Sequence, residues 1–282
     1  MALGWLLKHP NPLVRTAARV AGGELSVLAA GIALFGLLGT VPTLAAIVSI
    51  YSLVANPSDI EPQLASLAGV LPREVVAFLI DQLEREAARP QGQVGIALAT
   101  SLFLALWSAR AAVSAAIDAL HHAYRVPEDR GFTHRVALRF GMALGGLVGL
   151  LVTAVVVVAL PAVVALLGAT INTIDWVAVM RWPVLLVVYN GAMMALYHLA
   201  PSPRDVARHR VLPGAVAATS LWLIGSFGLS VYVSRIANYE NVYGAFGGVV
   251  VVILWFYISA ISIVLGGVLN AELERTAALA GE

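Results

Sequence analysis

The sequence predicts an all-α polytopic membrane protein with six transmembrane helices, plus amphipathic helices between the first and second spans. Of its 282 residues, 60% are hydrophobic and 12% are charged, about half of the roughly 25% charge of soluble domains. Several apolar runs exceed the roughly 20 residues that a helix needs to cross hydrocarbon, where a helix satisfies its own backbone. The clearest run, residues 249–265, contains no charged residue.

Composition also limits the chemistry. The chain has no cysteine, which excludes disulfides and thiolate metal ligands. We expect no cofactor, no metal ion and no catalytic residue. The net charge of +1 gives no indication of a nucleic-acid partner. Because the N-terminus lacks the ordered basic region, apolar core and cleavage site of a signal peptide, we expect the chain to begin in the cytoplasm.

The expected sections are a cytoplasmic N-terminal segment at 1–24, a single six-span membrane domain at 25–274 and a cytoplasmic tail at 275–282. Within the first section, residues 11–22 predict a short helix with Arg15 and Arg19 on one face, because they are four residues apart. A basic amphipathic helix beside a span is typical of a segment attracted to anionic lipid. An ordinary basic flank fits the pattern equally well.

The apolar runs place the six spans. They cover residues 25–55, 94–124, 140–167, 176–199, 211–234 and 249–265, with the second helix continuing past the membrane to about Tyr124. Pro42 and Pro161 should bend the spans that contain them, and Pro213 suits a first helical turn.

The connections between spans carry the polar residues. Residues 56–92 predict an outer amphipathic cap, whose second helix places Val75, Leu79 and Leu83 on one face. Residues 125–139 read as a short basic connection. After it, a ridge of small residues at four-residue spacing allows close packing with a helix of the same chain or of a second copy. The ridge consists of Gly141, Gly145 and Gly149.

The distribution of Lys and Arg predicts the orientation, because basic residues near span ends stay in the cytoplasm. One side would hold Lys8, Arg15, Arg19, Arg110, Arg125, Arg130, Arg135, Arg139, Arg204, Arg208, Arg210 and Arg275. Both termini are therefore expected in the cytoplasm, and the chain in the bacterial inner membrane.

Five segments carry a family resemblance: LAAIVSIYSLVANP (44–57), LWSARAAVSAAIDAL (106–120), LPGA (212–215), YVSRIANYENVYGAFGG (232–248) and GGVLNAEL (266–273). From about Glu24 to Glu274 the chain resembles the YihY/BrkB family of bacterial inner-membrane proteins, formerly mislabelled ribonuclease BN. The resemblance implies six spans, the inner membrane and no agreed activity, although envelope lipid transport and small-solute export have both been suggested for members.

Three positions depart from the family pattern. A tyrosine pair in the first span is Leu34 and Phe35 here, and a usual Asn after the second span is His121. A Glu two residues before the last-span Asn is Val268. The last change removes an intramembrane carboxylate, which weakens any proposal that needs a buried proton carrier at that point.

Two groups of residues are candidates for binding. An inner vestibule would combine a polar stripe of the second helix with the end of the last span: Arg110, Ser114, Asp118, His121, Arg125, Asn270 and Glu272. Its arginines can hold a phosphate or carboxylate, or Arg110 can pair internally with Asp118 or Glu272. Asn270 can instead bond a neighbouring backbone, and Glu272 can meet an arginine.

An outer mouth would combine Asn238, Tyr239, Glu240, Tyr243 and Gly244. Its polar side chains can contact a headgroup or solute, or simply form a turn with interfacial aromatic anchors. Asn190, in the fourth span, is an intramembrane polar residue that needs either an interhelical bond or a solute contact.

The sequence does not predict a ribonuclease or a hydrolase. It contains no His-rich metal cluster, no aromatic and basic nucleic-acid surface and no G-x-S-x-G motif. We expect a protein that handles or transports phospholipid or another envelope amphiphile. The alternatives are a secondary transporter of a small solute or ion, using Asp118 or Glu272 for coupling, and a non-transporting partner in an envelope complex. Membrane lipids, an envelope protein and a second copy of the chain are the candidate partners.

Overall fold

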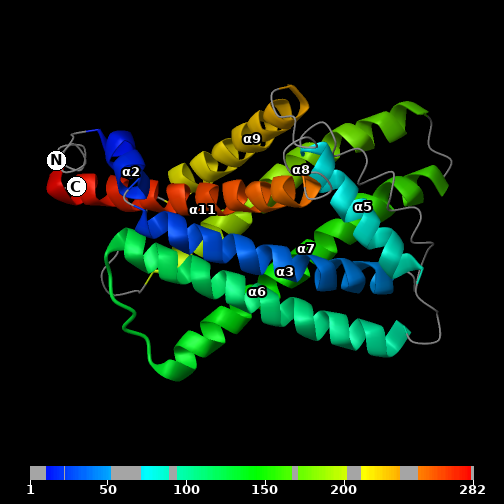
Figure 1. Cartoon of the computed structure of the whole chain (residues 1–282), viewed down its shortest axis with the longest axis horizontal. Coiled ribbons are helices and arrows are strands. Elements are labelled where there is room, and N and C mark those ends of the chain that lie inside the picture. Colours follow the sequence, from blue (N-terminus) through cyan, green and yellow to red (C-terminus); the bar gives the residue numbers. More distant parts are fainter. Residues whose placement is uncertain are drawn as a thin grey trace.

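The computed structural model describes residues 11–21, 23–51, 71–88, 94–166, 171–201, 211–235 and 247–280. Within these ranges the regular structure is entirely α-helical, which confirms the predicted class. The helices are α2 (Pro12–Ala21), α3 (Glu24–Tyr51), α5 (Arg73–Ala87), α6 (Val94–Tyr124), α7 (Phe132–Leu166), α8 (Ile171–Leu199), α9 (Leu212–Arg235) and α11 (Gly247–Ala280). They form an elongated bundle in which α3, α6 and α11 run along the long axis (Figure 1).

Five of these helices contain segments long and apolar enough to cross a membrane. The segments are Glu24–Ile50, Leu98–Tyr124, Phe132–Thr153, Leu212–Ser234 and Gly247–Ala278. In α8, the apolar part that the structure describes is the shorter Pro183–Leu199. Five of the six predicted spans are therefore confirmed by length and composition.

Two helices extend further than their apolar runs indicated. The connection predicted at 125–139 ends at Gly131, because α7 begins at Phe132 and carries Arg135 and Arg139 in its first turns. Likewise, α11 continues to Ala280, into the predicted tail. An apolar run marks the part of a helix that lies in hydrocarbon, and the hydrogen-bonded helix itself continues into the polar region.

The core lies where α3, α6, α8, α9 and α11 meet, and it is built from small and medium apolar side chains. Its fully buried members include Ala29, Ile117, Ala119, Leu120 and Val264. α3 packs most extensively against α6. Gly39 of α3 lies so close to α6 that an added Cβ would be 3.2 Å from the Cβ of Ser108. Small residues therefore bring these helices together, as is typical of membrane bundles.

Among the described residues, no helix packs closely against the predicted glycine ridge of α7. A Cβ added to Gly141, Gly145 or Gly149 would meet no described atom within 4 Å, so the ridge is open along the part of the chain that the structure describes. Among the described glycines, the closest approach to another helix's backbone instead joins α9 to α11, where a Cβ on Gly214 would collide with the carbonyl oxygen of Gly266.

A reciprocal pair of hydrogen bonds also joins α9 to α11. The indole nitrogen of Trp222 donates to Ser259 Oγ at 3.0 Å, and that of Trp255 donates to Ser226 Oγ at 3.1 Å. Each helix supplies one tryptophan and one serine, four residues apart and hence on one face. These bonds satisfy the indole donors inside the bundle.

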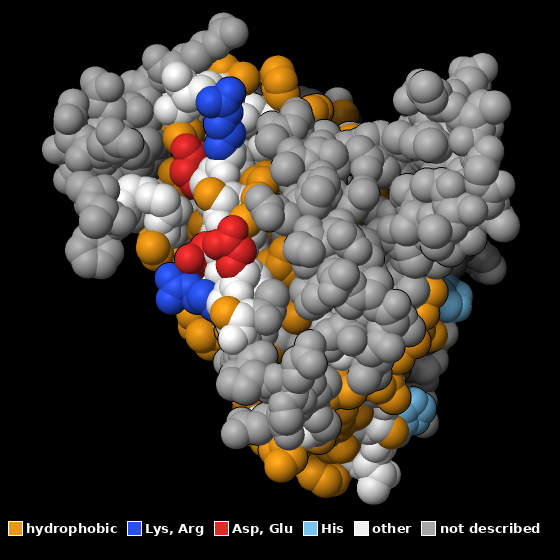
Figure 2. Space-filling model, turned by 90° about the vertical axis from the view of Figure 1, so that its right-hand side faces the viewer, with side chains coloured by type: hydrophobic (Ala, Val, Ile, Leu, Met, Phe, Trp, Pro, Cys, Tyr) orange, Lys and Arg blue, Asp and Glu red, His pale blue; other side chains and the backbone are white. Residues whose placement is uncertain are grey.

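α5 covers the end of the bundle opposite α2 (Figure 1). Val75 and Leu83 are buried and Leu79 packs on the same cluster, which confirms the predicted amphipathic face. Figure 2 faces this end and shows the described charged side chains gathered over α5, with hydrophobic side chains on the flank below. The first predicted helix of the cap, at 56–70, lies outside the described residues.

Candidate functional site

The candidate site lies at the end of the bundle where α2, the C-terminal end of α6 and the C-terminal end of α11 come together (Figure 1). α2 begins with Asn11, whose side-chain oxygen accepts a hydrogen bond from the backbone N–H of Leu13 at 2.9 Å. Pro12 follows in the first helical position, where no N–H is needed. Arg15 and Arg19 are four residues apart on this helix, hence on one face, and both reach Glu272 of α11.

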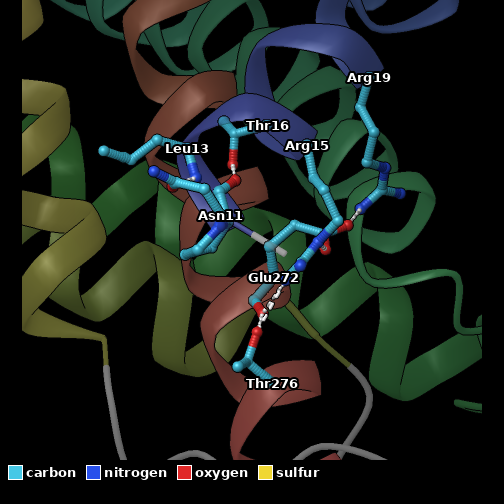
Figure 3. A network of polar contacts seen from close by, with 8 residues as sticks. Asn11, Leu13, Arg15, Thr16, Arg19, Glu272 and Thr276 are labelled. Atoms are coloured by element: carbon cyan, nitrogen blue, oxygen red, sulfur yellow. Dashed lines mark hydrogen bonds and ion pairs between the residues drawn. The ribbon is translucent and has the colours of Figure 1, made fainter. Parts of the chain in front are cut away.

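Arg15 and Arg19 bind Glu272 (Figure 3). Arg15 Nε donates to Glu272 Oε2 at 2.6 Å, and Arg19 Nη1 donates to Glu272 Oε1 at 3.2 Å. The side chains are 12%, 9% and 2% exposed for Arg15, Arg19 and Glu272. Arg15 also donates to Thr276 Oγ1 at 2.7 Å. Of the two interpretations of this basic helix, attraction of its arginines to anionic lipid is not supported by their contacts, because both bind a carboxylate inside the chain.

Arg19 connects this ion-pair network to α6. Its Nη2 donates to the carbonyl oxygen of His122 at 3.2 Å, which places a cation at the negative end of the α6 dipole. Burial, and then repulsion from Arg125, lower the pKa of Arg19 below its ordinary value, while Glu272 raises it. Arg19 thus faces a second positive charge across a shared space.

That space is a cavity of about 640 Å³. Its lining comes from three helices and the connection after α6: Ala18, Arg19, Glu24, Leu25, Asp118, His121, His122, Arg125, Val126 and Glu128. Of the predicted inner vestibule, Asp118, His121 and Arg125 therefore meet here. The lining does not include Arg110, Ser114, Asn270 or Glu272.

Each carboxylate in the cavity has a basic neighbour. Glu24 lies 2.7 Å from His122 Nε2, and Asp118 lies 2.6 Å from Arg139 Nη2. The third carboxylate, Glu128, lies 3.7 Å from both His121 and Arg130. Among the described residues, Arg125 is then the one cavity cation without a carboxylate partner.

The backbone of Arg125 is also unusual, with φ of 57°. Its N–H donates to His122 O at 3.3 Å, and the N–H of Val126 donates to His121 O at 3.1 Å. These two bonds form a Schellman cap at the end of α6, in which the left-handed position usually holds glycine. An arginine at this position costs backbone strain and directs a long cationic side chain over the cavity.

Arg110 and Ser114 lie deeper along α6, away from the cavity. The Arg110 guanidinium carbon lies 5.8 Å from the ring centroid of Trp107 and 5.0 Å from that of Phe140. The predicted pairing with Asp118 or Glu272 is wrong, because those carboxylates bind Arg139 and the two α2 arginines. The polar stripe of α6 is therefore divided between two environments.

Asn270 and Asn190 make structural bonds. Asn270 is fully buried, accepts a hydrogen bond from Gly214 N at 2.8 Å and donates to Val211 O at 3.1 Å. It thus satisfies backbone groups at the start of α9. Asn190 donates to Leu186 O in its own helix at 3.0 Å, and its side-chain oxygen is buried without a partner among the described residues.

The predicted outer mouth is not placed. Asn238, Tyr239, Glu240, Tyr243 and Gly244 lie outside the described residues, so their role stays a prediction. Among the residues that are described, no group of three His, Cys, Asp or Glu side chains is arranged to hold a metal ion.

Arg130 is a site residue that the sequence did not single out. Its guanidinium donates to the carbonyl oxygens of Leu199, Ala200 and Pro201 at 2.9, 2.9 and 2.6 Å. A cation at this position completes the C-terminal end of α8. Its partners follow about 70 residues later in the chain, so no local pattern distinguishes Arg130 from the neighbouring arginines.

The fold and site define a multi-pass all-α membrane protein with a polar cavity at the end that carries α2. The chain belongs to the virulence factor BrkB family, whose model matches residues 16–282. The family resemblance read from the sequence is thereby confirmed.

Several named proteins are similar to this chain. A Bacillus subtilis (strain 168) protein named "Putative ribonuclease-like protein YfkH" is 37% identical over 189 residues, which are 66% of this chain and 68% of that protein. A UPF0761 membrane protein of Xanthomonas oryzae pv. oryzae is 30% identical over 35% of this chain and 23% of its own length. Another, the UPF0761 membrane protein Nmul_A0452 of Nitrosospira multiformis, is 35% identical over 32% of this chain and 21% of its own length. The match thus spans less than a quarter of these two UPF0761 proteins. No solved structure matches the chain.

Proposed function

We propose that this protein handles or transports phospholipid or another envelope amphiphile in the bacterial inner membrane, and that the cavity beside α2 receives the anionic headgroup. The observation that carries the proposal is Arg125, a cavity cation without a carboxylate partner among the described residues. Backbone strain of this kind costs of order 1–3 kcal/mol and tends to persist at functional sites. A phosphate would supply the anionic partner that Arg125 does not have among the described residues.

The topology that we propose has six spans, namely the five long apolar segments and α8, the fourth span in chain order. Both termini lie in the cytoplasm. α2 and the C-terminal ends of α6 and α11 lie at one end of the bundle (Figure 1), where Arg125 lines the cavity with Arg19. Basic residues concentrated near the span ends favour the cytoplasm for that end. The cavity would then open toward the inner leaflet, from which an amphiphile would enter.

The contacts of Glu272 and Asp118, the two carboxylates considered for coupling, favour an amphiphile over an ion-coupled solute. A coupled carrier needs a carboxylate that gains and loses a proton during transport. Glu272 is held between two arginines, and Asp118 is bound to Arg139. Val268, at the position of the family Glu, is fully buried and apolar.

The proposal includes no enzymatic activity, ribonuclease activity among them, and no cofactor or nucleic acid. The partner that we propose is membrane lipid. A secondary transporter of a small solute or ion and a non-transporting partner in an envelope complex are the alternatives, and one experiment distinguishes them.

The experiment is reconstitution in liposomes that contain fluorescently labelled phospholipid. We expect the protein to accelerate exchange of the label between leaflets. Gradient-driven solute uptake without leaflet exchange would instead support the transporter. If neither activity is found and another protein co-purifies stably, the result would support the structural partner and contradict lipid transport.

Substitutions at Arg125 separate its charge from its backbone strain. Arg125→Gly removes both, so we expect the variant to be about 1 kcal/mol more stable. We also expect leaflet exchange to slow by a factor of up to roughly ten. Arg125→Lys keeps a charge and should retain part of the exchange. Wild-type exchange by a well-folded Arg125→Gly variant would show that Arg125 does not bind the headgroup.

A further inference from the structure

A second cation lies inside the membrane-spanning part of α6, outside the cavity. Arg110 is near the middle of α6 (Val94–Tyr124) and within the span Leu98–Tyr124. At about 1.5 Å per residue, each end of the helix is about 20 Å or more away. An arginine at this depth is costly in hydrocarbon, and such residues usually have a partner or a functional role.

Arg110 has aromatic neighbours but no anionic one. Its guanidinium lies over Trp107 and Phe140, which stabilises the charge through the ring faces. Among the described residues it makes no ion pair, and its Nε is buried without a hydrogen-bond acceptor. One turn later, Ser114 Oγ is also buried without a partner. Two buried donors one turn apart on α6 therefore have no acceptor among the described residues.

The contact with Phe140 shows where these donors lie. Phe140 follows the start of α7 at Phe132 by about 12 Å of helix. The Arg110 side chain thus joins the middle of α6 to the first turns of α7, where Arg139 binds Asp118. A headgroup drawn inward from the nearer leaflet would meet it there.

The adjacent face of α7 offers room for a hydrocarbon chain. Trp107 is 57% exposed, and Leu144, one turn after Phe140, is 51% exposed. Beside them runs the open ridge of Gly141 and Gly145, where an added Cβ would meet no described atom within 4 Å. This exposed face combines a cation with an uncovered apolar surface in a membrane-spanning region, where the surrounding solvent is lipid.

We propose that Arg110 is the phosphate-binding residue of a membrane-facing phospholipid site between α6 and α7. The guanidinium donates hydrogen bonds to the phosphate diester, whose two free oxygens match the arginine fork. One acyl chain lies along the open ridge of Gly141 and Gly145. The site does not depend on transport, because a lipid can bind there whether or not the protein moves lipid.

Lipid retention measured by native mass spectrometry tests this site. The purified full-length protein is titrated with dioleoylphosphatidylglycerol and with dioleoylglycerol, which has the same acyl chains and no phosphate. We expect the phospholipid to bind at least roughly tenfold more tightly, and Arg110→Gln to remove most of that difference. Arg85→Gln is the matched control, because Arg85 is 70% exposed on α5, and it should bind as the wild type does.

Two further variants keep the test decisive if Arg110→Gln folds poorly. Arg110→Lys retains the charge without the fork and should bind several-fold more weakly. Gly145→Leu fills the ridge at an open position and should also weaken phospholipid retention several-fold. Unchanged retention in Arg110→Lys and Gly145→Leu would overturn the site, as would equal binding of dioleoylglycerol or displacement of the lipid by inorganic phosphate.

A further comparison separates this site from the proposed function. Arg125→Gly should retain phospholipid at Arg110 even where leaflet exchange is slowed. Loss of exchange with normal retention leaves the Arg110 site standing. If the wild type exchanges lipid between leaflets and every Arg110 variant retains phospholipid as the wild type does, the Arg110 site is overturned and the proposed function is not.

Discussion

Neutralising Glu272 should detach α2 from the bundle and lower the stability of the whole protein. In Glu272→Gln the side chain keeps its shape but loses its charge, and its amide NH2 group presents donors to one of the two arginines, which needs an acceptor. Glu272 is 2% exposed, and its partners Arg15 and Arg19 are 12% and 9% exposed. Water therefore cannot replace the lost carboxylate without opening the contact.

Removing one partner of a buried ion pair typically costs about 3–5 kcal/mol. We take the lower end, about 3 kcal/mol, because Arg15 retains Thr276 and Arg19 retains the carbonyl of His122. At about 2–4 °C per kcal/mol, the melting temperature should fall by about 6–12 °C.

Two measurements check this value. Thermal unfolding in detergent, followed by tryptophan fluorescence, gives the change in melting temperature. Limited trypsin digestion reports α2 itself, because Arg15 and Arg19 become cleavable when α2 leaves α11. Asp81→Asn is the control: it breaks an exposed pair with Arg85, 3.0 Å long with side chains 50% and 70% exposed. Exposed pairs contribute at most about 1 kcal/mol, so a shift of only about 2–4 °C or less is expected.

Replacement of all three charges tests the reasoning from the other direction. In the triple variant Arg15→Met/Arg19→Met/Glu272→Leu, no charge of this network remains buried and unpaired. Its stability should therefore be within about 1–2 kcal/mol of the wild type. The reasoning is refuted if Glu272→Gln melts like Asp81→Asn and its arginines stay protected from trypsin.

The remaining predictions concern the contact between α9 and α11, measured by the same melting assay. Gly214→Ala places a Cβ against Asn270 and the carbonyl oxygen of Gly266, so it should lower the free energy of unfolding by about 1–3 kcal/mol. Gly228→Ala, on the same helix, is the control: its Cβ meets nothing within 4 Å, and it should raise the free energy of unfolding by up to about 1 kcal/mol. If both glycines tolerate alanine equally, the close approach of the two backbones is wrong. Ser226→Ala removes the acceptor of the Trp255 indole and should cost about 0.6–2 kcal/mol. The exposed Ser234→Ala should be neutral, and an equal loss there would mean that the reciprocal bonds have no special role.

The membrane segments and the amphipathic helices could be predicted from the sequence because the signals that specify them are local. A run such as 249–265 enters hydrocarbon whatever its neighbours are, and the spacing of Val75, Leu79 and Leu83 places them on one helix face. The basic spacing of Arg15 and Arg19 likewise predicted the helix that now spans Pro12–Ala21. These properties need no knowledge of which helix lies beside which.

The partners of the charged residues could not be predicted. Several arginines were possible partners of Glu272 from the sequence. In the folded chain it binds Arg15 and Arg19, more than 250 residues earlier in the chain. The same packing left Arg110 among aromatic rings. An ion pair depends on distance in space, and sequence spacing does not fix that distance between separate helices.

Glycine shows the same division. The regular spacing of Gly141, Gly145 and Gly149 predicted a packing ridge, yet the structure leaves it open, and the intimate contact uses Gly214 and Gly266 instead. A small residue permits close approach, but only the arrangement of the bundle decides which helix approaches it. The sequence by itself determined that the chain spans a membrane as a helical bundle with basic residues toward one end. The tertiary structure alone decided that Arg15, Arg19 and Arg139 bind carboxylates, whereas Arg125 lines the cavity without one among the described residues.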